Sequence, residues 1–171
     1  YGQIVTMTAP QIGNYGVNEE DLESARPHVA GFIVRELSPI VSNWRATTDL
    51  STWLKKYGIP GIEGLDTRSL TKKLRSAGVM KACLSTEGLS DEEALKRARA
   101  WTGTVGADFV KEVTCKAAYN YNATAGDCEA FTVTGTNLNK PKNRPVRYRI
   151  AAYDFGAKTS IFRRLVASGF D

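Results

Sequence analysis

The 171-residue chain has little of the two residue types that most often build catalytic and metal sites: three cysteines and one histidine. The cysteines Cys83, Cys115 and Cys128 are nowhere spaced as Cys-x-x-Cys, which argues against a zinc site, and their odd number argues against a disulfide framework. We expect passive thiols in a reducing, cytoplasmic compartment. His28 has no nucleophile in a recognisable motif, so we expect it to be structural or on the surface.

Long hydrophobic runs and nucleotide-binding loops are also missing. No run of 18 apolar residues occurs and the start is not a signal peptide, so nothing indicates a membrane or export. Neither a P-loop nor a G-x-G-x-x-G fingerprint is present, and Asp154-Phe155-Gly156 lacks the other motifs of a kinase. We interpret Gly156 as allowing a tight turn, with Asp154 facing solvent or backbone amides. We predict no catalytic, cofactor-binding or metal-binding residue in this chain.

What is present is the composition of a globular protein. Hydrophobic residues make up 42% and charged residues 24%, which excludes low-hydrophobicity disorder. The net charge of +5 is too small and too spread out to require nucleic acid as a partner. Acidic runs at residues 19–21 and 91–93 are explained by solvation and by a helix N-terminus. The basic stretch Lys140 to Arg149 is interpreted as a linker, with a nucleic-acid-binding module as the alternative hypothesis.

Strands and helices alternate loosely along the chain, which is typical of an α/β or α+β protein. Short apolar, β-branched runs predict strands at residues 3–8, 29–34, 79–84 and 147–153. Capping residues followed by apolar positions three and four apart predict four helices, beginning at Thr47 or Thr48, at Asp66 or Thr67, at Ser90 and at Thr159. The third of these is expected to bury Ala94, Leu95, Ala98 and Trp101.

The last part of the chain changes character. Residues 138–146 contain two prolines and three basic residues, the composition of a linker. The strand and helix that follow form the first half of a βαβ unit whose closing strand is missing. We therefore expect both ends of the chain to lie inside a longer protein. The predicted parts are a first domain at 1–137 that lacks its beginning, a linker at 138–146 and the start of a second domain at 147–171.

Three segments carry a recognisable pattern. Residues 2–16 read G-Q-I-V-T-M-T-A-P-Q-I-G-N-Y-G, residues 61–78 read G-I-E-G-L-D-T-R-S-L-T-K-K-L-R-S-A-G, and residues 152–158 read A-Y-D-F-G-A-K. In order and spacing, they resemble the small, glutamine-hydrolysing subunit of carbamoyl phosphate synthetases. The resemblance extends over essentially the whole chain and is loosest at residues 114–136.

The resemblance implies a fold and a function. The fold is α/β: a swivelling β/β/α-type N-terminal domain, then the first strand and helix of a flavodoxin-like class I glutamine amidotransferase domain. Subunits of this family hydrolyse glutamine and pass ammonia to a large ATP-using subunit. That partner makes carbamoyl phosphate from bicarbonate for pyrimidine and arginine biosynthesis. A heterodimer is implied, with ATP, magnesium and potassium on the large subunit.

The family's catalytic residues do not carry over to this chain. Its nucleophilic cysteine lies in a G-x-C-x-G-[HQ] motif and its base in an H-P-E motif, and this sequence contains neither. The family's F-N-T-x-x-x-G-Y-Q-E segment, which helps to bind glutamine, is also missing. We expect this segment to be a scaffold and subunit-contact region that is inactive alone and binds neither nucleic acid nor membrane.

Overall fold

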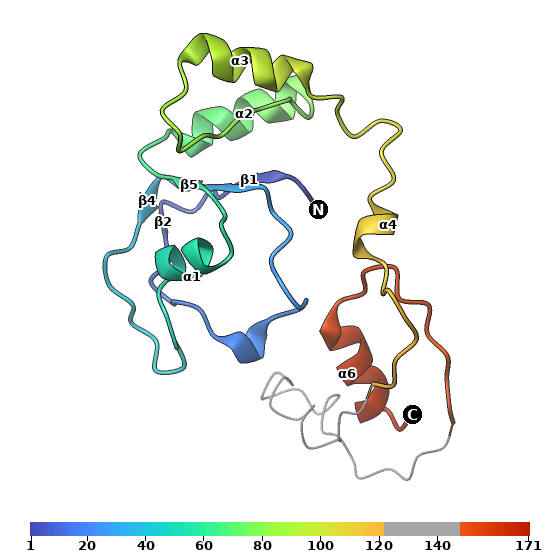
Figure 1. Ribbon diagram of the computed structural model, residues 1–171. Helices are drawn as coiled ribbons and strands as arrows, with labels where there is room; N and C mark the ends of the chain where they lie inside the picture. Colours follow the sequence, from blue (N-terminus) through green and yellow to red (C-terminus); the bar gives the residue numbers. More distant parts are fainter. Residues whose placement is uncertain (122–147) are drawn as a thin grey trace. The chain divides into compact units, whose positions relative to one another are not determined.

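The computed structural model describes residues 1–121 and 148–171, which divide into two compact units. Unit 1 comprises Tyr1–Glu20 and Arg26–Ala107, and unit 2 comprises Asp21–Ala25 and the described part of Asp108–Asp171. Figure 1 labels their helices and strands. The predicted linker at 138–146 lies outside the described residues, so the predicted domain boundary stays a prediction.

Two small parallel sheets form the centre of unit 1. Strands β1 (Ile4–Thr6), β3 (Gly31–Ile33) and β5 (Gly61–Ile62) make a sheet in the order β1-β3-β5, with Val5 opposite Phe32 and Phe32 opposite Gly61. Strands β2 (Gln11–Ile12) and β4 (Glu36–Leu37) pair beside it. The predicted strands at 3–8 and 29–34 are confirmed, and so is the α/β class. The strand predicted at 79–84 is wrong: these residues join no ladder, and Val79 is 86% exposed.

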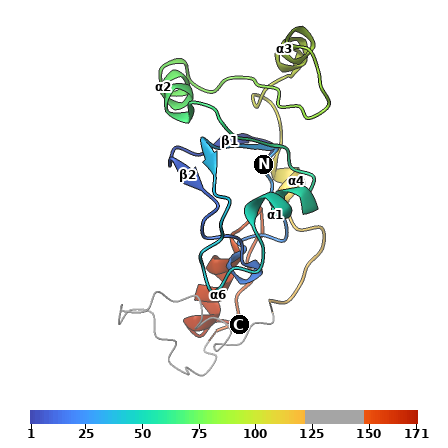
Figure 2. The same ribbon diagram turned by 90° about the vertical axis from the view of Figure 1, so that its left-hand side faces the viewer.

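Three α-helices surround these strands in unit 1. Helices α2 (Thr67–Ala77) and α3 (Asp91–Ala100) lie on one side of the strands and α1 (Leu50–Lys56) on the other (Figure 2). A 3₁₀ turn, η1 (Glu19–Asp21), ends at the first residue of the segment Asp21–Ala25 that belongs to unit 2.

Side chains close the N-terminus of each helix of unit 1. Asp66 and Ser90 cap α2 and α3 as predicted, because their oxygens accept the amides of Ser69 and Glu93. The cap predicted at Thr47 or Thr48 is wrong. Asp49 caps α1 instead, accepting the Thr52 amide at 2.8 Å. The amides of both threonines donate to the Val17 carbonyl, and Thr48 forms an antiparallel bridge with Val17, so these residues are held before the helix begins.

The core of unit 1 is small. Among the described residues, the buried apolar side chains are Val34, Leu54 and Ala98. The predicted buried face of α3 is therefore only partly right: Ala98 is buried, but Leu95 is 50% and Trp101 42% exposed because no described element covers them.

Unit 2 contains the short helix α4 (Val110–Val113) and the longer helix α6 (Thr159–Ala167). The strand predicted at 147–153 is wrong for the described residues 148–153: a single parallel bridge joins Tyr148 to Phe170. A strand needs a continuous partner, and within the described part of unit 2 the backbone of Tyr148 and Ile150 is hydrogen-bonded to Asp171 alone. No described helix has the length and apolar character required to cross a membrane.

Candidate functional site

The residues most able to perform chemistry are dispersed. The ring of His28 packs against Tyr1, with the ring centroids 5.8 Å apart. Cys83 is a half-buried free thiol of unit 1, Cys115 is an exposed free thiol of unit 2, and Cys128 lies outside the described residues. Within residues 1–121 and 148–171, no three metal-ligating side chains gather into a cluster. The expected absence of catalytic, cofactor-binding and metal-binding residues stays a prediction.

The most highly organised polar group is Asp154, at the turn before α6. Its Oδ1 accepts the backbone amides of Gly156 at 3.0 Å and Ala157 at 2.8 Å, and its Oδ2 accepts the Tyr119 hydroxyl at 2.8 Å. The Ala157 amide, followed by the Tyr119 hydroxyl, lowers the pKa of Asp154, so the carboxylate is charged at neutral pH. The same hydrogen bond to Asp154 raises the pKa of Tyr119 to about 12. Asp154 therefore faces backbone amides, which is one of the two orientations that the sequence predicts. Its hydrogen bonds stabilise the turn.

Gly156 allows this turn to pack closely on α4. Its φ is +94°, and a Cβ at this position would lie 2.7 Å from Cγ2 of Val113. A side chain here would force the turn away from the helix. Gly156 thus has the structural role that the sequence suggests.

The N-terminus of α6 is closed by a residue from far away in the sequence. The predicted Thr159 cap is wrong: Lys158 occupies the N-cap position and makes no side-chain cap hydrogen bond. Instead, the Glu23 carboxylate accepts the Ser160 amide at 2.9 Å, and the Glu23 carbonyl accepts the Thr159 amide at 3.0 Å. The Ser160 amide is the largest cause of a lowered pKa at Glu23. Sequence reasoning missed Glu23 because nothing local marks a cap that acts across 137 residues.

A hollow of about 560 Å³ lies beside Asp154 in unit 2. Ile150, Phe162, Leu165 and Phe170 supply apolar parts of its wall, and Cys115 and Tyr119 lie at the same hollow. Arg149 lines it as well and pairs with Asp171 at 3.4 Å. A wall with this many apolar side chains is better suited to packing against further polypeptide than to catalysis.

A second hollow, of about 710 Å³, lies in unit 1 beside β3 and α1. Phe32, Leu54 and Ile59 form part of its apolar wall, and Cys83 also lines it. Arg97 lines it too and pairs with Glu93 at 3.3 Å and with Glu87 at 3.8 Å, so this cation is already neutralised.

The charged runs singled out in the sequence have ordinary partners where they are described. Glu19 pairs with Lys56 at 2.8 Å and Glu20 with Arg45 at 3.5 Å, while residues 91–93 occupy the first turn of α3. Of the basic stretch 140–149, residues 140–147 lie outside the described residues. The described part therefore gives no support to the nucleic-acid alternative.

Comparison with known proteins shows which family the chain is similar to. Residues 1–84 match the family model described as "Carbamoyl-phosphate synthase small chain, CPSase domain". Proteins named carbamoyl phosphate synthase small chain align over nearly the whole chain. The one from Syntrophotalea carbinolica is 46% identical over 170 residues, and the one from Akkermansia muciniphila is 48% identical over 169. The one from Escherichia coli strain K12 is 43% identical over 168 residues.

These alignments cover 98–99% of this chain but only 42–43% of each relative. The chain thus spans about two fifths of the length of the curated relatives it matches. On the family model and on these identities, the chain belongs to the carbamoyl phosphate synthase small-chain family.

Proposed function

We propose that this chain is a scaffold and subunit-contact part of the glutamine-hydrolysing small subunit of carbamoyl phosphate synthase. The observation that carries the proposal is the identity of 46–48% to small chains over 99% of its length. In the proposed reaction, other parts of the subunit hydrolyse glutamine. The ammonia passes to a large chain that uses ATP, with magnesium and potassium, to make carbamoyl phosphate from bicarbonate.

Unit 1 is proposed to belong to a swivelling β/β/α-type domain. Its parallel strands with helices on both sides are compatible with that assignment. Its side chains supply no reacting group in the proposal, and their role is to present a surface to the large chain.

Unit 2 is proposed to open a flavodoxin-like amidotransferase domain. Two contacts support this role: Asp154 fixes the turn that leads into α6, and Glu23 closes the first turn of that helix. In such a fold, further strands would lie beside residues 148–153. The apolar hollow lined by Ile150 and Leu165 offers a surface on which they would pack.

The test compares nitrogen sources. The full-length small chain with its large chain should make carbamoyl phosphate from glutamine, and free ammonia should replace glutamine when the small chain is left out. Residues 1–171 added in place of the full small chain should give no glutamine hydrolysis. Glutaminase activity in residues 1–171 would contradict the scaffold role, and a complex that never uses glutamine would contradict the proposed function.

A further inference from the structure

Helix α2 carries charge of one sign. Its eleven residues include four cations, all exposed, and no acidic residue: Arg68, Lys72, Lys73 and Arg75. None of the four forms an ion pair with a described residue. Two other cations of unit 1 are paired, Lys56 with Glu19 and Arg97 with Glu93. The exposed side of α2 is therefore left with uncompensated positive charge.

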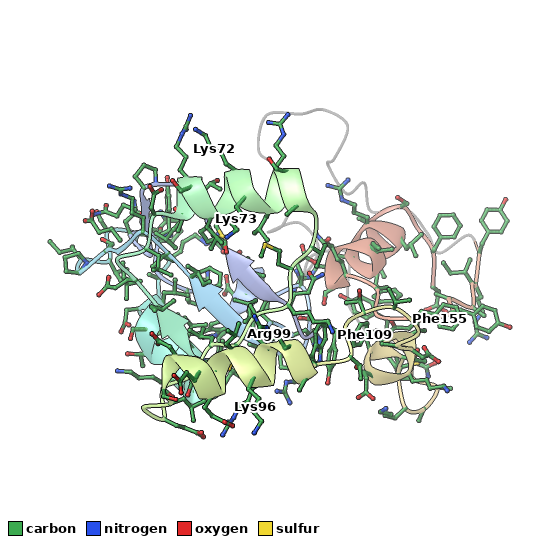
Figure 3. The ribbon with its side chains drawn as sticks, turned by 90° about the horizontal axis from the view of Figure 1, so that it is seen from above. Lys72, Lys73, Lys96, Arg99, Phe109 and Phe155 are labelled. Carbon is green, nitrogen blue, oxygen red and sulfur yellow. The ribbon has the colours of Figure 1, made fainter. Side chains whose placement is uncertain are left out.

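Three of these cations form a line. Arg68, Lys72 and Arg75 lie at positions i, i+4 and i+7 of α2, which places them on one stripe of the helix, here called the basic stripe. Leu70 and Leu74, at different positions around the helix, are half-buried. Figure 3 shows Lys72 projecting outward from α2. The helix dipole favours Arg75 in the last turn. Like charges four residues apart disfavour a helix, however, so the repulsion between Arg68 and Lys72 calls for another explanation.

Exposed apolar side chains lie at both ends of the same helix. Ile62 and Leu65, 38% and 40% exposed, precede α2, and Val79 and Met80, 86% and 42% exposed, follow it. Arginine together with exposed apolar groups is typical of surfaces that bind proteins. A nucleic-acid backbone would pair with the cations but would make no favourable contact with the apolar groups. Helix α2 also has no aromatic residue on which a base could stack.

We propose that the basic stripe, with the apolar residues at its two ends, is a docking surface for a carboxylate-rich face of another protein. A symmetric dimer through this surface is disfavoured, because it would bring two basic stripes together. The inference rests on the proposed function for the identity of the partner protein, which is the large chain. It adds which helix of the small chain makes the contact and what chemistry the large chain presents to it.

The test measures binding of the full-length small chain to the large chain. Reversing charge in the basic stripe with Arg68→Glu and Lys72→Glu should weaken binding by about tenfold or more and reduce its dependence on salt. The matched control is Lys96→Glu with Arg99→Glu, two exposed cations of α3 in the same unit (Figure 3). This pair should leave the dissociation constant within about twofold of wild type. Should the double reversal fail to fold, Arg68→Gln with Lys72→Gln should still weaken binding, by a smaller factor.

The possible outcomes separate the proposals. If the α2 variants bind the large chain like wild type, the docking proposal is wrong while the proposed function stands. If they instead lose binding to duplex DNA or lose self-association, the surface serves nucleic acid or a second copy and the docking proposal is overturned. If the wild-type small chain does not bind the large chain, both this inference and the proposed function fail.

Discussion

Glu23 closes the N-terminus of helix α6 by accepting the Ser160 amide at 2.9 Å, although the two residues are 137 positions apart. The Glu23 carbonyl accepts the neighbouring Thr159 amide, so two of the amides that begin the helix are satisfied by one residue. The segment Asp21–Ala25 therefore belongs to unit 2 by its contacts and lies between two parts of unit 1 in the sequence.

Removing this cap should loosen the start of α6. We expect Glu23→Ala to cost about 1 kcal/mol in local stability, the usual value for a lost N-cap. Amide hydrogen exchange should show faster exchange at Ser160, with much smaller changes in α2. Glu92→Ala, which removes an exposed acid in the first turn of α3, is the control and should leave Ser160 unaffected. Unchanged exchange at Ser160 in Glu23→Ala would show that the cap contributes little.

The cap should also depend on pH. Hydrogen bonding from Ser160, its largest cause, lowers the pKa of Glu23 below its ordinary value of 4.5. Stability from a lowered carboxyl pKa is complete above the unfolded value and is lost as pH falls through the folded one. The difference in unfolding free energy between wild type and Glu23→Gln should therefore be constant near neutral pH and shrink below a pH of about 4.5. A difference that grew in acid would contradict this assignment.

Tyr119 should titrate at a higher pH than an ordinary tyrosine. Because its hydroxyl donates to the Asp154 carboxylate, its pKa is raised from 10.0 to about 12. Asp154→Asn should bring this pKa back toward 10.0, since the carboxylate charge is removed. Absorbance of tyrosinate during alkaline titration measures the effect, and Tyr119→Phe should delete the late-titrating group. If no tyrosine of the wild-type protein titrates with a pKa near 12, the hydrogen bond from Tyr119 to Asp154 is contradicted.

Two glycines with similar backbone conformations should respond differently to alanine. Gly16 has a φ of +64°, and a Cβ there would lie 2.7 Å from the side chains of both Ala46 and Val41. Gly58 has a φ of +65°, with nothing within 4 Å of the same position. Gly58→Ala should cost about 1 kcal/mol for the left-handed backbone alone. Gly16→Ala should cost about 2–4 kcal/mol, because the steric clash adds to that penalty.

Chemical denaturation of the two variants provides the measurement. Equal losses would mean that the turn at Gly16 moves easily away from residues 41–48. A larger loss at Gly58 would contradict the packing of both turns.

Local signals in the sequence were reliable where the structure uses local contacts. Asp66 and Ser90 cap α2 and α3 because each side chain reaches an amide three residues ahead. Strands of two residues, such as β2 and β5, are too short to produce a periodic pattern, and the sequence did not predict them.

Distant contacts explain the remaining errors. The backbone amides of Thr47 and Thr48 donate to the Val17 carbonyl, a contact that the local sequence does not indicate. Glu23, rather than the predicted Thr159, caps α6. At the candidate site, the hydrogen bonds from backbone amides to Asp154 could be predicted from the tight turn at Gly156. The hydrogen bond from the Tyr119 hydroxyl could not. No pattern in the sequence connects residue 119 to residue 154.

The parallel pairing of unit 1 has a consequence for how this chain folds. Every strand pair described here is parallel, and the paired residues, such as Ile4 with Gly31 and Phe32 with Gly61, are roughly 25 to 30 positions apart. No tight hairpin can start these sheets, so each pairing has to close a long loop before it gains a hydrogen bond. The helices have mostly local contacts, and we expect them to form first. Sheet assembly should then limit the folding rate and leave unpaired strands exposed to aggregation while it proceeds.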